Sequence, residues 1–305
     1  MTLLTLFTAP KPFTDAHIAT IQRNALRSWT LLPEVEVIVL GEEEGLAEAA
    51  RELGIRHLPQ VERGPSGAPR LSSMMAQVRA HSQSPLLGVI NADILLMSDF
   101  LHAVRQAAAL RKRFLLLSRR WDMDITTPLE FAPGWEERLR AEVRAKGKLH
   151  KPAGSDFFVF PRECYLETPP FIIGRAGWDN WMIYKARQEK WDVIDLTPSV
   201  MIVHQNHDYR HLPGGQPHYN LPETEENIRL AGGVANIRYT ILDANLCLVK
   251  GRLRPPAPSW GRFWRGVELL LRRLFAFLPE EQVENIARPR RWAKRLRRLL
   301  RQDGG

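Results

Sequence analysis

Short apolar runs alternate with amphipathic stretches through the first half of the chain. The apolar runs cover residues 3–7, 35–40, 55–58, 86–90 and 114–117. Stretches whose hydrophobic positions recur every three or four residues lie between them, at 15–29, 44–53, 71–81 and 99–110. The first pattern is typical of strands buried on both faces, and the second of helices that cover a sheet. The alternation therefore predicts an α/β fold with a mostly parallel central sheet flanked by helices.

The pattern is less regular after residue 121, but further elements are still predicted. Helices are expected at 135–146, 178–188 and 223–230, and strands at 157–160, 193–196 and 200–204. We expect this first domain to comprise residues 1–250. The prolines of residues 251–258 indicate a stiff linker, and Ser259 is placed to cap a following helix.

Residues 259–305 are predicted to form basic amphipathic helices. The residues expected to contact a surface are Trp260, Phe263, Trp264, Arg272, Arg273 and Trp292. Large apolar residues on one helix face with basic residues around them are typical of helices that lie on an anionic membrane. The pattern leaves one alternative open, in which the apolar face packs on the first domain or on a second copy in a homodimer.

The distribution of charge supports a separate role for this segment. The protein carries a net charge of +9, and residues 251–305 contain 14 basic and 5 acidic residues, so the first 250 residues are neutral. A basic protein is a candidate for nucleic-acid binding, but no nucleic-acid-binding motif accompanies these charges. We therefore expect no nucleic-acid partner, and instead a neutral domain with a surface-binding tail.

Cysteine content and hydropathy indicate the compartment. Only Cys164 and Cys247 occur, which is too few for a disulfide scaffold and fits the reducing cytoplasm. The apolar start of the chain is soon interrupted by Pro10 and Pro12, so an export signal is not expected, and no apolar run reaches the length of a membrane span. We expect a peripheral protein at the cytoplasmic face of the cell membrane.

Candidate chemistry is concentrated at the ends of predicted strands. Asp93 lies just past the strand predicted at 86–90, and His204 ends the strand predicted at 200–204, with His207 in the loop that follows. Ligands of parallel sheets bind beyond the carboxyl ends of the strands. Carboxylate and imidazole, together with phosphate oxygens, suit Mn²⁺ or Mg²⁺. A turn aspartate and solvent-facing histidines are the simpler interpretation of the same residues.

Five ordered segments give the chain a family resemblance: IQRNALRSW (21–29), INADIL (90–95), GSDFFVFPRE (154–163), PPFIIGRAGWDNW (169–181) and VHQNHDYRHLPGG (203–215). Together they resemble the glycosyltransferases with the GT-A fold, and within them a family-2-like bacterial and plant group of nucleotide-diphospho-sugar transferases. The resemblance covers residues 3–245. It implies a Rossmann-like domain that moves a sugar from a UDP- or GDP-type donor to an acceptor hydroxyl, with Mn²⁺ or Mg²⁺ neutralising the departing diphosphate.

The resemblance implies roles for individual residues. INADIL resembles the metal-binding Asp-x-Asp element with Asn91 in the first acidic position, so Asp93 is expected to hold the metal with His204 and His207. The residues expected to bind the donor are Thr8, Ala9, Pro10, Lys11, Arg23, Asn91, Ala92 and Arg120. Asp122 and Asp124 form a second Asp-x-Asp and are a rival metal site.

Asp179 matches the position of the base in inverting members of this group. Such members usually have Glu-Asp there, whereas this chain has Trp178-Asp179. The residues expected to bind the acceptor or a sugar are Asp156, Trp178 and Asn180. Helix capping by Asp179 and core packing by Trp178 are the structural alternatives.

Two other functions are alternatives to sugar transfer. A sugar-1-phosphate nucleotidyltransferase needs a glycine-rich loop after the first strand, and this chain has Thr8-Ala9-Pro10-Lys11 there. A non-catalytic nucleotide-sugar-binding or membrane adaptor on the same fold is the alternative suggested by Asn91. The tail favours a glycan or lipid-linked acceptor at the membrane.

Overall fold

The computed structural model describes residues 2–207, 221–275 and 277–287, and the chain divides into two compact units, 1–255 and 256–305. The helices are α1 (Ala16–Thr30), α2 (Leu46–Leu53), α3 (Leu71–His81), α4 (Ser98–Leu110), α5 (Trp135–Lys146), α6 (Trp178–Gln188), α7 (Pro222–Leu230), α8 (Trp260–Leu274) and α9 (Glu280–Ile286). The strands are β1 (Leu4–Thr8), β2 (Val35–Leu40), β3 (Arg56–Leu58), β4 (Leu86–Ile90), β5 (Ile94–Leu95), β6 (Phe114–Leu117), β7 (Trp121–Met123), β8 (Lys148–Leu149), β9 (Phe157–Pro161), β10 (Asp192–Asp195), β11 (Val203–Gln205), β12 (Leu246–Val249) and β13 (Arg252–Arg254).

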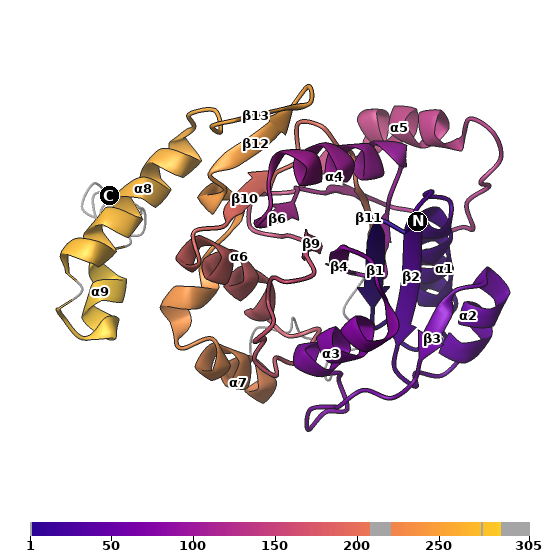
Figure 1. The fold of residues 1–305 in the computed structure, drawn as a ribbon, viewed down its shortest axis with the longest axis horizontal. Coiled ribbons are helices and arrows are strands. Elements are labelled where there is room, and N and C mark those ends of the chain that lie inside the picture. The colour runs from indigo at the N-terminus through magenta and orange to yellow at the C-terminus, as the bar shows by residue number, and fades with distance from the viewer. Residues whose placement is uncertain (1, 208–220, 276, 288–305) are drawn as a thin grey trace, which may run out of the picture. The chain divides into compact units, whose positions relative to one another are not determined.

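The first unit is built on a nine-stranded sheet with the order β13-β12-β10-β6-β9-β4-β1-β2-β3. Strands β4, β1, β2 and β3 are parallel to their neighbours in that block, as are β12, β10 and β6 in the other. Between the two blocks, β9 runs antiparallel to both β4 and β6. The prediction of a mostly parallel central sheet flanked by helices is confirmed (Figure 1).

Helices cover both faces of this sheet, which explains why its central strands are apolar throughout. One face packs against α1 and α4 through residues such as Trp29 and Phe100. The other face packs against α3 and α6 through residues such as Met74 and Met182. Figure 1 shows α3 and α4 on opposite sides of the strands. Every residue of β4 and β9 is buried, as expected for strands without a solvent-facing side.

The direction of β9 places Asp156 at the functional edge of the sheet. Because β9 is antiparallel, the residue before it lies beside the carboxyl end of β4, and the Asn91 N–H donates to the Asp156 carbonyl at 2.9 Å. A second, four-stranded sheet with the order β5-β11-β7-β8 lies beyond this edge. Its register places His204 opposite both Ile94 and Asp122.

Two details of the chain path correct the sequence expectations. The linker expected at 251–258 begins later, because Arg252–Arg254 pairs with β12 as an antiparallel strand. Lys250 and Gly251 have φ angles of 49° and 73°, and two residues with positive φ make the tight turn that suits such a hairpin. The strand expected at 200–204 lies at Val203–Gln205.

The second unit contains α8 and α9. The predicted cap of α8 is confirmed, since the Ser259 hydroxyl accepts from the Arg262 N–H at 3.2 Å. Trp292 lies outside the described residues. A search of the described helices for length and continuous apolar character finds none able to cross a membrane.

Candidate active site

Three predicted metal ligands lie together at the carboxyl edge of the main sheet. Asp93 follows β4, His204 is on β11, and His207 follows in the next loop. Asp93 Oδ2 is 3.1 Å from His207 Nε2 and 3.8 Å from His204 Nε2, and one ligand atom from each residue lies within 4.8 Å of the others. Asp93 Oδ1 is buried and has no hydrogen-bond partner among the described residues. A carboxylate with an unused oxygen beside two imidazoles fits Mn²⁺ or Mg²⁺.

Positive charge surrounds the Asp93 carboxylate. Burial by itself would raise the pKa of Asp93, but the charge of His204, the hydrogen bond from His207 and the charge of Lys11 outweigh it and hold the pKa well below its usual range. Lys11 Nζ lies 3.3 Å from His207 Nε2. The buried Gln22 side chain fixes the Lys11 backbone, since it accepts from the Lys11 N–H at 2.7 Å and donates to its carbonyl at 2.9 Å. Lys11, which was expected to bind the donor, thus lies beside the cluster.

A buried glutamine that the sequence analysis missed holds β11 in place. Gln205 Nε2 donates to the Ile21 carbonyl at 2.7 Å and to the Asp93 carbonyl at 3.2 Å. Gln205 Oε1 accepts from Asn24 Nδ2 at 3.0 Å. The segment at 21–29 therefore contributes to the site through Asn24, which holds the Gln205 side chain. Its neighbour Arg23, predicted to bind the donor, pairs instead with Glu52 at 3.1 Å.

A polar network extends from the histidines to Asp156. His204 Nδ1 is 3.5 Å from Asp122 Oδ1, and Asp122 also contacts His150 Nδ1 at 2.6 Å. The Arg120 guanidinium binds Asp122 at 2.8 Å and also pairs with Asp156. Arg120 is therefore at the site, but both carboxylates already engage it. Asp122 thus lies beside His204, although His204 Nδ1 has no hydrogen-bond partner among the described residues.

Asp156 presents one oxygen for binding. Its Oδ1 accepts from Asn91 Nδ2 at 3.0 Å and from Arg120. Its Oδ2 is buried without a hydrogen-bond partner among the described residues. Asn91, which replaces the first acid of the expected Asp-x-Asp element, thus orients Asp156. A carboxylate held by one oxygen is well placed to accept a hydroxyl proton donor through the other.

Asp179 stands in the first turn of α6, and its carboxyl group has a raised pKa. Burial raises its pKa to about 6, and the nearby charge of Asp156 adds to the rise, whereas the backbone N–H groups of Asn180 and Gly177 oppose it. Asp179 Oδ1 is buried and has no hydrogen-bond partner among the described residues. Gly177, with φ of 111°, gives the turn that leads into the helix.

Helix α7 holds the loop that leads to Asp179, a contribution the sequence analysis missed. The fully buried Asn227 accepts from the Ile172 N–H at 2.9 Å and donates to the Ile172 carbonyl at 3.0 Å and the Ala176 carbonyl at 3.3 Å. One turn earlier, Glu223 binds Arg175 Nε at 2.7 Å and the Ser66 hydroxyl at 2.7 Å. Both side chains of the Arg175–Glu223 pair are 9 % exposed, so the loop is firmly tied to α7.

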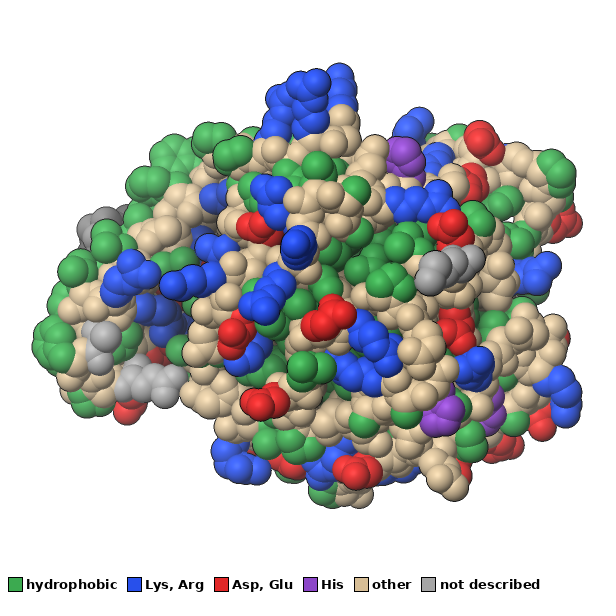
Figure 2. Space-filling view, viewed as in Figure 1, with side chains coloured by type: hydrophobic (Ala, Val, Ile, Leu, Met, Phe, Trp, Pro, Cys, Tyr) green, Lys and Arg blue, Asp and Glu red, His purple; other side chains and the backbone are tan. Residues whose placement is uncertain are grey.

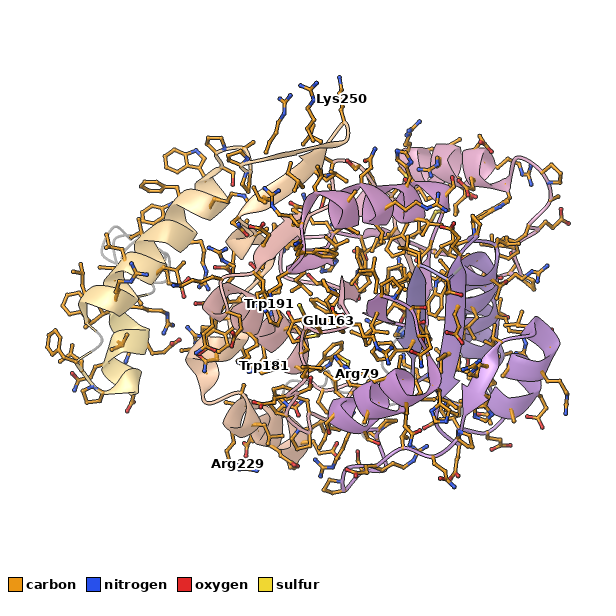
Figure 3. The ribbon with its side chains drawn as sticks, in the orientation of Figure 1. Arg79, Glu163, Trp181, Trp191, Arg229 and Lys250 are labelled. Carbon is orange, nitrogen blue, oxygen red and sulfur yellow. The ribbon has the colours of Figure 1, made fainter. Side chains whose placement is uncertain are left out.

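Two residues expected to bind a sugar have structural partners instead. Trp178 is 7 % exposed and packs edge-on against Phe158, with ring centroids 5.7 Å apart. Trp181 is equally buried, beside Phe171 and below the α6 ribbon in Figure 3. Asn180 Nδ2 donates to the Tyr239 carbonyl at 2.7 Å. Trp178 and Trp181 therefore leave little aromatic surface exposed, because burial in the core uses it.

The remaining predicted donor residues line the carboxyl edge as backbone and small side chains. Thr8, Pro10 and Ala92 are buried and Ala9 is partly buried, next to the ends of the parallel strands β1 and β4. Among the described residues the rival acidic pair is not part of a group of metal ligands: Asp122 contacts Arg120 and His150, and Asp124 Oδ1 accepts from Asn206 Nδ2 at 2.7 Å.

Comparison with known proteins gives matches to solved structures. No family model matches the chain, and no curated protein matches it. A mannosyltransferase from Pyrobaculum calidifontis, in complex with GDP-Man and Mn²⁺, is 14 % identical with a TM-score of 0.43; the match covers 66 % of this chain and 56 % of that one. This chain thus spans little more than half the length of that protein.

A second match is glucosyl-3-phosphoglycerate synthase from Mycobacterium tuberculosis, which is 15 % identical with a TM-score of 0.46 and is covered over 90 % of its length by 84 % of this chain. The same enzyme is matched in complex with Mn²⁺, UDP and phosphoglyceric acid, at 14 % identity and a TM-score of 0.46 over 78 % of this chain and 79 % of that one. All three matches have low sequence identity, and the likeness concerns the fold alone.

Proposed function

We propose that the first unit transfers a sugar from a UDP- or GDP-type donor to an acceptor hydroxyl and depends on Mn²⁺ or Mg²⁺. The observation that carries the proposal is the partly buried cluster of Asp93, His204 and His207, in which the buried Asp93 Oδ1 has no partner among the described residues. These three residues would hold the cation, which when bound neutralises charge on the departing diphosphate. Lys11, 3.3 Å from His207, adds fixed positive charge for a phosphate oxygen.

Asp156 is assigned to sugar binding and Asp179 to proton removal. The unpartnered Oδ2 of Asp156 accepts a hydrogen bond from a sugar hydroxyl, while Asn91 and Arg120 keep the carboxylate in place. Asp179 takes the proton of the acceptor hydroxyl as that oxygen attacks the anomeric carbon and the bond to the diphosphate breaks. Attack on the face opposite the leaving group inverts the configuration at the anomeric carbon. A pKa of about 6 makes Asp179 a stronger base than an ordinary aspartate and leaves it mostly ionised at neutral pH.

The reaction would take place at the cytoplasmic face of the cell membrane, on a lipid-linked or other glycan acceptor. Support for this part of the proposal comes from the charge distribution, since the first 250 residues are neutral and residues 251–305 carry +9. Anionic lipid attracts such a segment.

Calorimetric titration of UDP and GDP with and without Mn²⁺ tests the donor and metal assignments. We expect nucleotide binding that depends on Mn²⁺ in the unmodified protein and loses this dependence in Asp93→Asn. The matched control is Asp124→Asn, which removes a carboxylate of the rival pair and leaves the Mn²⁺ dependence unchanged. Equal nucleotide affinity with and without the metal in the unmodified protein would contradict the proposed metal site.

Hydrolysis of UDP- and GDP-sugars, measured alongside binding, separates a transferase from an adaptor. A glycosyltransferase without its acceptor slowly hydrolyses its own donor, whereas an adaptor binds the nucleotide sugar and leaves it intact. Metal-dependent binding with no hydrolysis of any donor sugar would support the non-catalytic alternative.

A further inference from the structure

Helix α8 exposes an apolar face that a soluble helix would normally bury. Trp260, Phe263, Leu270 and Leu274 are 77 %, 55 %, 56 % and 59 % exposed, and their spacing places them along one side of the helix. Just beyond the helix, Phe277 is 79 % exposed. Figure 2 shows hydrophobic side chains gathered on the surface over α8. A continuous apolar stripe of this kind marks a site that another apolar phase or molecule covers.

The charged side of α8 is engaged inside the second unit. Arg265 is only 8 % exposed and pairs with Glu268 at 3.0 Å. Glu268 also pairs with Arg272 at 3.3 Å, and Arg272 pairs with Glu284 of α9 at 2.6 Å. These α8 residues lie on the side opposite the apolar stripe. Helix α8 therefore pairs its charged side chains within the second unit and exposes its apolar ones. An ordinary surface helix does the reverse, since it buries its apolar side and exposes its charges.

We propose that this apolar stripe inserts into the interfacial layer of an anionic lipid bilayer, which gives the proposed membrane location a defined contact surface. Glu268 and Glu284 are already paired with arginines, so they add little repulsion toward anionic headgroups. The exposed Arg273 borders the stripe, where it can meet a lipid phosphate. Depth of insertion and charge attraction then act together, as in other interfacial helices.

Charge also favours lipid over a second copy of the chain. A dimer formed through this stripe would bring together two segments that each carry +9 over residues 251–305. Two segments of the same charge repel each other, whereas an anionic bilayer attracts both. The stripe is thus better matched to a lipid surface than to itself.

Vesicle flotation of the full-length protein tests this assignment. We expect flotation with vesicles of phosphatidylcholine and phosphatidylglycerol, little with phosphatidylcholine alone, and weaker binding as salt is raised. The double variant Phe263→Ser with Leu270→Ser is expected to bind the anionic vesicles at least about tenfold more weakly. Leu166→Ser is the matched control, because Leu166 is 70 % exposed in the first unit and is expected to have no effect.

Three outcomes would overturn the proposal: no flotation of the unmodified protein with anionic vesicles, equal flotation with neutral ones, or no difference between the double variant and the control. Light scattering after gel filtration tests whether a second copy of the chain covers the stripe instead. A dimer of the unmodified protein that becomes a monomer in the double variant would assign the stripe to a subunit interface. The catalytic assignment is tested separately, because Asp179→Asn is expected to float like the unmodified protein.

Discussion

The candidate active site and helix α8 differ in which side chains they bury and which they expose. At the edge of the main sheet, Asp93, Asp156 and Asp179 are set into the apolar body of the first unit, and each keeps a buried oxygen without a partner in the described part of the chain. In α8 the charges pair with one another and the apolar residues face outward. Each arrangement carries a cost that only a ligand offsets: a polar one for the first and an apolar one for the second.

The largest effect is expected from Asp179, the proposed base. Asp179→Asn keeps the shape of the side chain but removes the base, so we expect kcat to fall by about 10² to 10⁴ while nucleotide binding is unchanged. The control is Glu189→Gln just after the same helix, where the side chain pairs at the surface with Lys185. An Asp179→Asn variant with full activity would show that Asp179 is only structural.

The next largest effect is expected from Asp122, which lies beside the proposed metal ligand His204. Asp122 lies 3.5 Å from His204 Nδ1, and the loss of such orienting carboxylates weakens metal affinity by about 10- to 100-fold. We expect Asp122→Asn to reduce the thermal stabilisation by Mn²⁺ in the absence of nucleotide. Asp124→Asn serves as the control, and an identical Mn²⁺ response of the two variants would count against the orienting role.

The sequence predicted those parts of the site that follow local patterns, and it did not predict the contacts that depend on strand pairing. The apolar runs and the position of Asp93 after β4 follow local patterns, and they were predicted. The proximity of His204 and Asp122 depends on the pairing of β11 with β7. A strand was predicted near β11, but β7 has only three residues, too few to leave a pattern, and the pairing itself is not visible in local hydropathy. The antiparallel direction of β9, which brings Asp156 to the site, also leaves no mark on local hydropathy. Trp178 is buried beside Phe158, and the sequence could not indicate this because an aromatic residue suits a core and a sugar site equally.

A third prediction concerns the loop that leads to Asp179, the proposed base. Asn227→Ala leaves the Ile172 backbone unpaired, and each buried group so left costs about 1–3 kcal/mol. We expect a lower melting temperature and a kcat reduced by about tenfold, with the affinity for the nucleotide unchanged, because Asp179 shifts while the metal cluster does not. Asn236→Ala is the control, since that amide caps carbonyls near the surface of the same region. Equal losses in kcat and in nucleotide affinity would indicate general destabilisation instead.

The smallest predicted effect is a pH dependence that the two regions should not share. The base must be ionised, and burial raises the pKa of Asp179 to about 6, so kcat/KM is expected to fall as the pH drops through 6 and to be about half its plateau there. Vesicle binding depends on arginines, which stay charged over this range, so flotation is expected to be constant from about pH 5.5 to 8. Activity would be measured on soluble acceptors, which keeps membrane binding out of the profile. An acidic limb centred near pH 4 would instead mean that Asp179 has an ordinary pKa in the working enzyme, and that the unpartnered oxygen is solvated when substrate is bound.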